Sequence, residues 1–342
     1  MATSQQLVLN ATARSAYIFN AFISNLTTTR HCTHYATSKG NIMKNVIVFG
    51  SMNMDLSIES DHMPTLGETI VGSGFITNAG GKGANQAVAA AKLGASVFML
   101  GAVGTDAFGN QLIAEMVDQG VVCDNIARKE GVPTGVALIT RVHGDNFITI
   151  DSGANFSTTI AGICESLDTL ANPGDVFLMQ LECDKQTTWA AAKAAHERGM
   201  YVVINPAPAA PIPHEVLPSL NMVVVNEGEC ETITGIYPNN KQDGARAAEK
   251  LMRAGVSCVV ITLGKRGSLV FCEGECIECV PDKVSVVDTT CAGDTYIGAL
   301  VAAYARGLSL AEGAALANKA SALACTKVGA QQSIPTLAEL NT

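Results

Sequence analysis

The feature that most constrains the fold is a series of short, continuously apolar segments that alternate with longer amphipathic ones. The apolar segments cover 45–50, 96–104, 175–182, 201–208, 222–229 and 258–264. Continuous apolar character is typical of strands that are buried on both faces of a parallel sheet. The stretches between them carry Ala, Leu, Lys and Glu at helical spacing, among them 83–93, 107–119, 185–198 and 240–254. This order predicts a three-layer, Rossmann-like α/β fold, in which helices cover both faces of a mostly parallel sheet.

Two further regions interrupt or precede this pattern. The stretches at about 56–77 and 134–150 have the Gly and Pro turns of antiparallel strands, and we expect a small second sheet, or lid, over one end of the main sheet. Residues 1–42 hold no Asp or Glu. We expect residues 1–43 to be a disordered extension, and 44–342 to form one domain. The extension has the composition of a transit peptide, but an upstream extension of a chain that starts on Met43 explains it as well, and organellar targeting is not favoured.

Charge and cysteine content exclude several classes of function. The net charge of −9 leaves no basic field for nucleic acid, and no apolar run reaches the length of a membrane span. Eleven scattered cysteines, an odd number in a long chain, favour free thiols and a cytoplasmic location. Cys272, Cys276 and Cys279 form the densest cluster, and a zinc site there is a minor alternative to a hairpin.

Chemistry is expected where strands end, because ligands of open α/β sheets bind beyond the carboxyl ends of the strands. In the segment VVDTTCAGDTYIGAL at 286–300, we expect a strand to end near Asp288 and a turn of small residues to lead into a helix. The free N–H groups of such a helix start bind an anion, and Asp294 in the first turn could accept a proton from an attacking hydroxyl. A plain capping carboxylate is an alternative of equal weight.

Two other segments offer groups for a polyol. In NAGGKGANQAVAAAKLGA at 78–95, a glycine turn presents Lys82, and Asn85 and Gln86 occupy the first helical turn; a left-handed turn before a packing helix is the alternative. Asn53 and Asp55 follow the first strand and share one face when extended, so that Asp55 could accept hydrogen bonds from two vicinal hydroxyls. An Asx-rich turn is the alternative. Familiar nucleotide motifs, G-x-x-x-x-G-K-[ST] and G-x-G-x-x-G after the first strand, are missing from the sequence.

These segments together resemble a known family. GGKGANQAVAAAKLGA…GAVGTDAFG and DTTCAGDTYIGAL are similar, in order and spacing, to the two signatures of the ribokinase-like (phosphofructokinase-B type) sugar kinases. NPAPA at 205–209 and KVGAQQSIP at 327–335 resemble its ribokinase branch, and the similarity covers about 44–340. The resemblance implies an ATP-dependent kinase that phosphorylates the 5-hydroxyl of D-ribose to ribose 5-phosphate.

The resemblance also implies roles for particular residues. Asp294 would be the catalytic base, with an anion hole built from the backbone of Ala292, Gly293 and Asp294. The sugar would be bound by Asn53, Asp55, Gly81, Lys82, Gly83, Ala84, Asn85 and Glu182. Mg²⁺ and the nucleotide would be bound by Asn226, Glu229, Thr262, Leu263, Gly264, Lys265, Arg266, Gly267, Gly293 and Asn318. A K⁺ site would involve Asp288, Thr290, Ala324, Lys327, Gly329 and Ser333.

Departures and alternatives accompany the resemblance. Cys291 replaces the family's usual Gly or Ala, and Asn318 replaces a frequent His. The family implies a homodimer that pairs its lids. The rivals are a sister kinase for deoxyribose, fructose or a nucleoside, and a non-catalytic sugar-binding regulator. Asp55 disfavours deoxyribose, because a missing hydroxyl would leave an acceptor unpaired.

Overall fold

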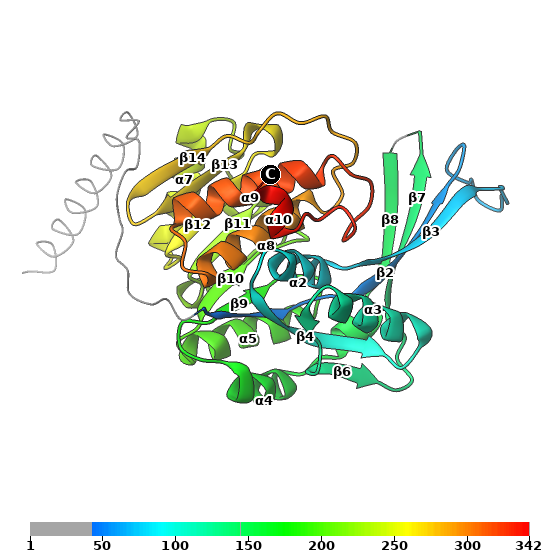
Figure 1. Ribbon diagram of the computed structural model, residues 1–342, viewed down its shortest axis with the longest axis horizontal. Helices are drawn as coiled ribbons and strands as arrows, with labels where there is room; N and C mark the ends of the chain where they lie inside the picture. The colour runs from blue at the N-terminus through cyan, green and yellow to red at the C-terminus, as the bar shows by residue number, and fades with distance from the viewer. Residues whose placement is uncertain (1–42, 144, 342) are drawn as a thin grey trace, which may run out of the picture.

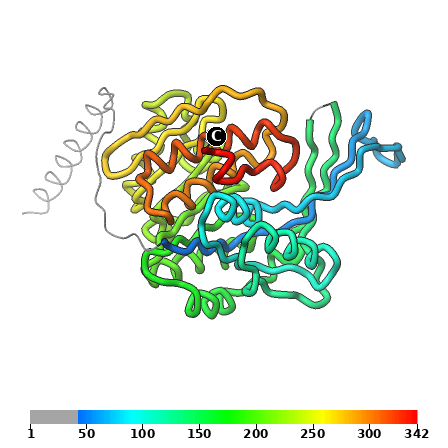
Figure 2. Tube along the Cα trace, viewed as in Figure 1, coloured from blue at the N-terminus to red at the C-terminus, as the bar shows by residue number. Residues whose placement is uncertain are grey.

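The computed structural model describes residues 43–143 and 145–341. The expected extension at 1–43 therefore lies outside the described residues, apart from Met43. Within these ranges, no helix is both long enough and apolar enough to cross a membrane. Figure 2 traces the chain and places the C-terminal segment beside α2 (Lys82–Lys92), where the Gln331 amide donates to Asn85 Oδ1 over 3.2 Å.

The main sheet has ten strands and is mostly parallel, as predicted (Figure 1). Its order is β14-β13-β12-β11-β10-β9-β1-β4-β5, with β6 paired beside β4. The parallel pairs are broken at one edge, where β12, β13 and β14 run antiparallel. The strands are β1 (Asn45–Phe49), β4 (Ser96–Gly104), β5 (Val121–Val122), β6 (Ile126–Lys129), β9 (Val176–Met179), β10 (Tyr201–Ile204), β11 (Met222–Val225), β12 (Cys258–Thr262), β13 (Ser268–Cys272) and β14 (Glu275–Cys279).

Helices cover both faces of this sheet, because successive side chains of each strand alternate between two apolar cores. Val46 and Val48 of β1 pack with α2, α3 (Ala107–Asp118), α8 (Ala292–Ala305) and α9 (Leu310–Ala324). Ile47 and Phe49 pack on the opposite face with α4 (Ile160–Leu170), α5 (Lys185–Glu197), α6 (Glu227–Thr234) and α7 (Lys241–Arg253). A short helix, α10 (Leu337–Leu340), follows α9. The three-layer prediction is therefore confirmed.

A second sheet of four strands projects from one end of the main body (Figure 1). Its order is β3-β2-β7-β8, with β2 (Asn53–Glu59), β3 (Ser73–Gly80), β7 (Gly135–Val142) and β8 (Asp145–Asp151). These strands correspond to the lid expected at about 56–77 and 134–150, but the sheet already begins at Asn53. The first sugar-site candidates therefore belong to the second sheet rather than to the end of β1.

The prediction of a strand that ends near Asp288 is wrong. Residues 280–290 contain no strand, and Val284, Val286 and Val287 are exposed. A run of β-branched residues resembles a strand locally, but a strand also needs a hydrogen-bonded neighbour. Here the N–H groups of Val287 and Asp288 both donate to the carbonyl of Cys325, just beyond α9.

The cysteine cluster forms a hairpin, as favoured. Phe271 of β13 lies opposite Cys276 of β14, and Ser268 lies opposite Cys279. All ten cysteines within the described residues are free thiols. The described residues also contain no group of three or more His, Cys, Asp or Glu side chains placed to hold a metal ion.

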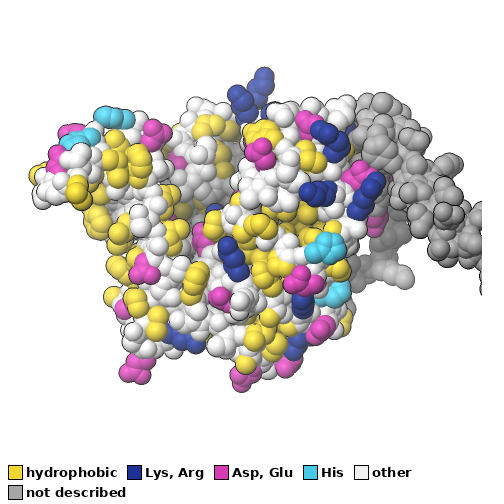
Figure 3. Space-filling model, turned by 180° about the vertical axis from the view of Figure 1, so that it is seen from behind, with side chains coloured by type: hydrophobic (Ala, Val, Ile, Leu, Met, Phe, Trp, Pro, Cys, Tyr) yellow, Lys and Arg dark blue, Asp and Glu magenta, His cyan; other side chains and the backbone are white. Residues whose placement is uncertain are grey.

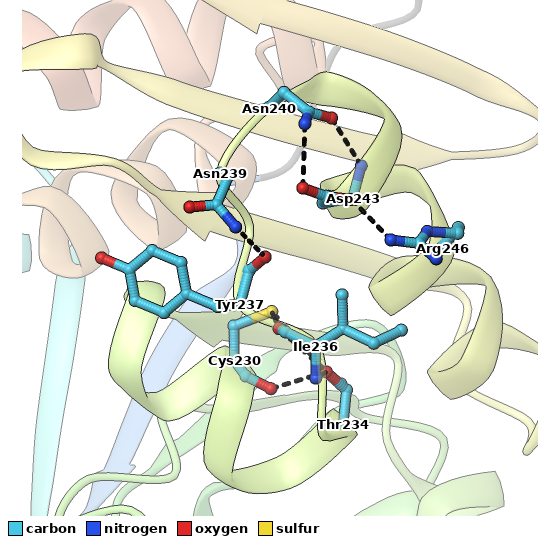
Figure 4. A network of polar contacts seen from close by, with 8 residues as sticks. All are labelled: Cys230, Thr234, Ile236, Tyr237, Asn239, Asn240, Asp243 and Arg246. Carbon is cyan, nitrogen blue, oxygen red and sulfur yellow. Dashed lines mark hydrogen bonds and ion pairs between the residues drawn. The ribbon is translucent and has the colours of Figure 1, made fainter.

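Local hydrogen bonds fix the turn that joins α6 to α7 (Figure 4). The Thr234 hydroxyl donates to the carbonyl of Cys230 over 2.6 Å and accepts from the N–H of Ile236 over 3.2 Å. The Asn240 side chain caps α7 by accepting from the N–H of Asp243 over 3.0 Å. These bonds hold the far end of α6, the helix whose first turn carries site candidates.

Candidate active site

The glycine turn before α2 brings the two candidate residues of β2 against the helix start. Asn53 lies opposite Gly80, and Asp55 lies opposite Asn78. A Cβ on Gly80 would stand 2.3 Å from Asp55 Oδ2, and Gly81 has a φ of +90° with its Cβ position 2.8 Å from the Asn53 nitrogen. Glycine is therefore required twice, once for space and once for backbone conformation. The turn allows the Asp55 carboxyl to pack directly against it.

Lys82 and Glu182 meet beside this turn. The backbone N–H of Lys82 donates to Glu182 Oε2 over 3.2 Å, and the Ser51 hydroxyl donates to the same oxygen over 2.6 Å. Burial alone would lower the pKa of Lys82, but the nearby carboxylates of Asp294 and Glu182 raise it above its usual value. Lys82 therefore stays cationic in a half-buried position.

Asp55 has an unusual proton affinity. Burial, followed by the negative charges of Glu182 and Asp294, raises its pKa from 3.8 to about 7. Three carboxyl groups thus converge on one region, which destabilises the ionised form of Asp55. A ligand with several hydroxyl donors would relieve this repulsion, because it supplies hydrogen bonds to the charged form.

Asp294 lies in the first turn of α8, whose N-cap is Cys291 with a left-handed φ of 65°. The first intrahelical hydrogen bond runs from the N–H of Thr295 to the Cys291 carbonyl over 2.8 Å, so the N–H groups of Gly293 and Asp294 lie in the turn before it. Cys291 itself is buried, and burial raises the pKa of its thiol well above the usual value. The helix start thus offers N–H groups to an anion beside an unionised thiol.

The Asp294 side chain does not cap its own helix. Its carboxylate accepts from the side-chain amides of two residues of α2, Asn85 over 3.0 Å and Gln86 over 2.9 Å. The helix start has no side-chain cap hydrogen bond. The capping alternative is therefore disfavoured, and Asp294 is presented between the helix start and the Lys82 turn.

A cavity of about 160 Å³ brings two of the sugar-site candidates, Lys82 and Asp294, together with phosphate-site candidates. Its lining comes from α2, α6, α8 and the carboxyl ends of β10, β11 and β12. The lining residues are Lys82, Asn205, Val224, Val225, Asn226, Glu229, Thr262, Cys291, Gly293, Asp294 and Ile297. A phosphoryl group in this cavity would lie beside the α8 start.

Asn226 and Glu229 form a capping box at the start of α6. The Glu229 N–H donates to Asn226 Oδ1 over 2.8 Å, and the Asn226 N–H donates to Glu229 Oε2 over 2.9 Å. Asn205 also donates to Glu229 Oε2, over 3.2 Å, and burial raises the pKa of Glu229. The N-x-x-E spacing therefore has a structural use as well as the expected role in metal and phosphate binding.

The candidate nucleotide loop, 262–267, begins at the last residue of β12 and continues in a tight turn, in which the Leu263 N–H donates to the Gly267 carbonyl over 2.7 Å. Lys265 is exposed, whereas Arg266 binds the carbonyl of Asn239 over 2.7 Å and Glu227 over 2.5 Å. The Arg266 guanidinium is thus used to hold the α6–α7 connection.

Asn318 stands apart from the cavity lining. It is buried, and its amide donates to Ser268 Oγ over 2.9 Å and to the Ala314 carbonyl over 3.0 Å. Both hydrogens of the amide are used inside the protein. A contact between Asn318 and adenosine stays a prediction, and it would use the side-chain oxygen of Asn318, Oδ1.

The structure brings the two segments of the candidate K⁺ site together through Asp288. One carboxylate oxygen accepts from the Thr290 N–H over 2.9 Å, and the other from the Gly329 N–H over 3.1 Å. Burial would raise the pKa of Asp288, but these hydrogen bonds lower it. Lys327, by contrast, forms an ion pair with Glu339 of α10 over 2.7 Å.

Ser333 and Ala324 complete this candidate set. The buried Ser333 hydroxyl donates to the Ala330 carbonyl over 2.7 Å, and the Ala324 carbonyl accepts from the Lys327 N–H over 3.1 Å. Both groups therefore shape the loop that follows α9.

A larger cavity of about 500 Å³ lies elsewhere, beside α7 and the segments that precede β11 and β12. It opens at the amino ends of these strands. Its arginines are paired, Arg246 with Asp243 over 2.6 Å and Arg253 with Glu249 over 2.5 Å. The smaller cavity is the better candidate site, because it lies at the carboxyl ends and contains the free helix start.

Gln180 and Asn205 were not predicted as site residues, yet they lie beside Gln86 at the site. The Gln180 amide donates to Gln86 Oε1 over 2.7 Å, and the Gln86 amide donates to Asn205 Oδ1 over 3.2 Å. Each follows a continuously apolar strand, β9 or β10. Position at a strand end was the signal that could have found them.

Comparison with known proteins agrees with this geometry. Residues 43–337 match the pfkB family carbohydrate kinase description. A ribokinase of Schizosaccharomyces pombe is 38% identical over 310 residues, covering 87% of this chain and 97% of the relative. A ribokinase of Bacillus subtilis is 36% identical over 299 residues, covering 87% of this chain and 98% of the relative.

A solved structure is similar over the same range. The Arabidopsis thaliana ribokinase complexed with ribose and ATP aligns with a TM-score of 0.79 at 32% identity, covering 88% of this chain and 98% of that one. The chain therefore belongs to the pfkB family of carbohydrate kinases.

Proposed function

We propose that this protein is an ATP-dependent ribokinase that transfers the γ-phosphoryl group of ATP to the 5-hydroxyl of D-ribose. The observation that carries the proposal is the cavity that brings together Lys82, the start of α8 with Asp294, and the Asn226–Glu229 pair. The names of the similar proteins support ribose as the sugar and ATP as the donor.

The protein's groups divide the reaction between them. The carboxylates of Asp55 and Glu182 accept hydrogen bonds from the sugar hydroxyls, and the amide of Asn53 donates to a sugar oxygen. Asp294 accepts the proton of the attacking hydroxyl as the O–P bond forms and the bond to the leaving ADP breaks. Lys82 and the N–H groups of the α8 start stabilise the charge on the transferred group.

Two metal ions are part of the proposal. Asn226 and Glu229 offer oxygen ligands at the phosphate end of the cavity, which suits Mg²⁺, and a bound Mg²⁺ would neutralise phosphate charge. Asp288 joins the turn before α8 to the loop after α9, and the carboxylate and carbonyl oxygens there suit K⁺. These residues would hold the cation behind the anion-binding turn.

The lid supports a homodimer. Apolar side chains of this sheet stand exposed, namely Phe75, Ile76, Leu138, Phe147, Ile148 and Ile150. In Figure 3, hydrophobic side chains gather on the lobe at the left, which is the lid seen from behind. An exposed apolar sheet of this kind is stabilised when a second copy covers it. The free thiols agree with a cytoplasmic location, which is also part of the proposal.

The decisive experiment is a coupled ADP-release assay on the purified chain, with ribose, 2-deoxyribose, fructose and adenosine as acceptors. We expect ribose to give the highest kcat/KM and 2-deoxyribose to be at least about tenfold poorer, because Asp55 would lose a hydrogen-bond donor. Equal efficiency with 2-deoxyribose would contradict the assigned role of Asp55. A higher kcat/KM with fructose or adenosine would replace ribose by that substrate, and no turnover with any acceptor would favour a non-catalytic binding protein.

A further inference from the structure

Asp294 is held by two neutral amides rather than by its own helix. Asn85 donates to one carboxylate oxygen over 3.0 Å, and Gln86 donates to the other over 2.9 Å. Asn85 is also a candidate for contact with the sugar. Gln86 is fully buried, at 0% exposure, and is not among the residues that line the cavity. It therefore reaches the reaction through Asp294.

The orientation of the Gln86 amide is determined by its neighbours. The Gln180 amide donates to Gln86 Oε1 over 2.7 Å, so the Gln86 nitrogen must face the other way. Its two hydrogens then go to Asp294 Oδ1 over 2.9 Å and to Asn205 Oδ1 over 3.2 Å. A flipped Gln86 amide would place its oxygen against two other oxygens, which is repulsive.

The same chain of amides continues to the phosphate end of the site. Asn205 uses its nitrogen to donate to Glu229 Oε2 over 3.2 Å and to the Val224 carbonyl over 3.1 Å. Gln86 and Asn205 thus connect Asp294 to Glu229 without adding charge. Every amide nitrogen in this chain donates and every contact is buried or partly buried, which favours a single arrangement.

We propose that Gln86 is a positioning residue that sets the orientation of the Asp294 carboxylate toward the attacking hydroxyl, with Gln180 and Asn205 fixing Gln86 in turn. The inference rests on the proposed function of Asp294 as the base. Hydrogen bonds from Asn85 and Gln86 to separate oxygens hold the carboxylate plane, and loss of the Gln86 bond leaves it free to rotate. A small misplacement of a base lowers turnover while substrate binding is retained.

The first test is Gln86→Met, which keeps the length of the side chain and removes its donors. We expect kcat to fall about 10- to 100-fold, while the KM for sugar and for ATP changes less than about threefold. Gln180→Met leaves the Gln86 donors in place but frees the amide to rotate, so we expect a smaller fall in kcat of the same kind. This milder variant also decides the matter if Gln86→Met does not fold.

Thr234→Val is the matched control for lost stability. It removes a buried hydroxyl at the far end of α6, where Thr234 binds the Cys230 carbonyl, and it leaves the amide chain intact (Figure 4). Melting temperatures are measured for all variants, and we expect Thr234→Val to keep the wild-type kcat. A fall in kcat that tracks melting temperature across the variants, control included, would overturn the positioning role.

A double-mutant cycle with Asp294→Asn tests whether Gln86 acts through Asp294. We expect Gln86→Met to lower kcat less than about threefold when Asp294 is already Asn, because effects that share one carboxylate are not additive. Equal factors in both backgrounds would refute the inference. The cycle uses whichever acceptor the wild-type protein turns over fastest, so a failure of ribose as substrate refutes the proposed function and leaves the Gln86 comparison measurable.

Discussion

The two sheets are built from similar β-forming sequence, yet they differ in what covers them. In the main sheet, both faces of every central strand are buried under helices, as in β9, where all four residues are buried. In the lid, every residue of β8 is exposed, including Phe147, Ile148 and Ile150. Helices stabilise the first sheet within one chain. The second sheet lacks such cover over the described residues, and its apolar side chains are exposed to solvent.

The difference extends to the chemistry. The main sheet and its helices position Asp294, Asn226 and Glu229, which would act on the phosphoryl group in the proposed reaction. The lid contributes Asn53 and Asp55, which would bind the sugar in the proposed reaction. In the proposed reaction the main sheet and its helices would therefore determine the rate of transfer, and the lid would determine which sugar is accepted and when the site closes.

The largest effect on activity is expected from a substitution in the main sheet and its helices. Asp294→Asn should lower kcat by about 10² to 10⁴, because the variant cannot accept the proton of the hydroxyl. Asn is nearly isosteric and can still accept a hydrogen bond from Asn85 or Gln86, so the fold and ATP binding should persist. Steady-state kinetics and calorimetry of nucleotide binding make the measurement. Turnover close to that of the wild type would remove Asp294 from the mechanism.

A matched pair of leucines compares the stability of the two sheets. Leu178 of β9 has 0% exposure, and Leu138 of β7 has 52%. Leu178→Ala should lower the free energy of unfolding by about 2–5 kcal/mol, because it leaves a cavity in the core. Leu138→Ala should change it by about 0.5 kcal/mol or less at a dilution where the protein is monomeric, and should weaken self-association.

Denaturant unfolding and light scattering follow these two variants. Similar losses of stability for both would mean that the lid is already covered in the monomer. An unchanged dimer in Leu138→Ala, and also in Ile148→Ala, would argue that association uses another surface.

Sugar binding by the lid residue Asp55 should depend on pH. Since the pKa of Asp55 is raised to about 7 in the folded protein without sugar, this carboxyl is largely protonated below that pH. In the unfolded chain Asp55 has its usual pKa of 3.8, so between about pH 4 and 7 the folded state binds a proton that the unfolded state has lost. The contribution of Asp55 to stability therefore falls as pH rises from about 4 to 7. Sugar hydroxyls favour the ionised form, and binding should release up to about one proton at pH 6–7.

Calorimetry of sugar binding in buffers of different ionisation enthalpy measures that proton. Asp55→Asn should bind sugar more weakly and release none. Glu182 and Asp294 face Asp55, and Lys82 stands beside them, so Glu182→Gln is the control for a neighbouring carboxyl. Proton release that survives in Asp55→Asn would assign it to another group.

The smallest effect concerns the proposed cation behind the α8 turn. Activity should be several-fold lower in sodium-only buffer than in potassium at equal ionic strength, because the cation would order the turn that carries the anion-binding N–H groups. Asp288→Ala should lose the response while sugar binding is retained. The test is a potassium titration at saturating Mg-ATP. A flat response in the wild-type protein would contradict the site, and Lys327 would be a poor substitute, since it pairs with Glu339.

Local pattern was sufficient for much of the fold and for part of the site. The six apolar segments predicted the strands β1, β4, β9, β10, β11 and β12, because burial on both faces leaves a continuous apolar run. The glycine turn before Lys82 was also visible, since a φ of +90° at Gly81 requires a residue without a side chain. The run of valines before Asp288 led to a wrong prediction of a strand, because a strand depends on a hydrogen-bonded neighbour that local sequence does not specify.

Sequence by itself determined the alternating order of strands and helices, the glycine turn and the identity of the polar residues at the strand ends. Only the tertiary structure decided how those residues are used. Asp294 is over 200 positions from Asn85 and Gln86, and their contact arises because α2 and α8 pack on the same face of the sheet. This contact decides whether the Asp294 carboxylate caps its own helix or is held in the site by the amides of α2. Periodicity reports which face of an element is buried, whereas the partner of a buried polar group is set by packing between distant segments.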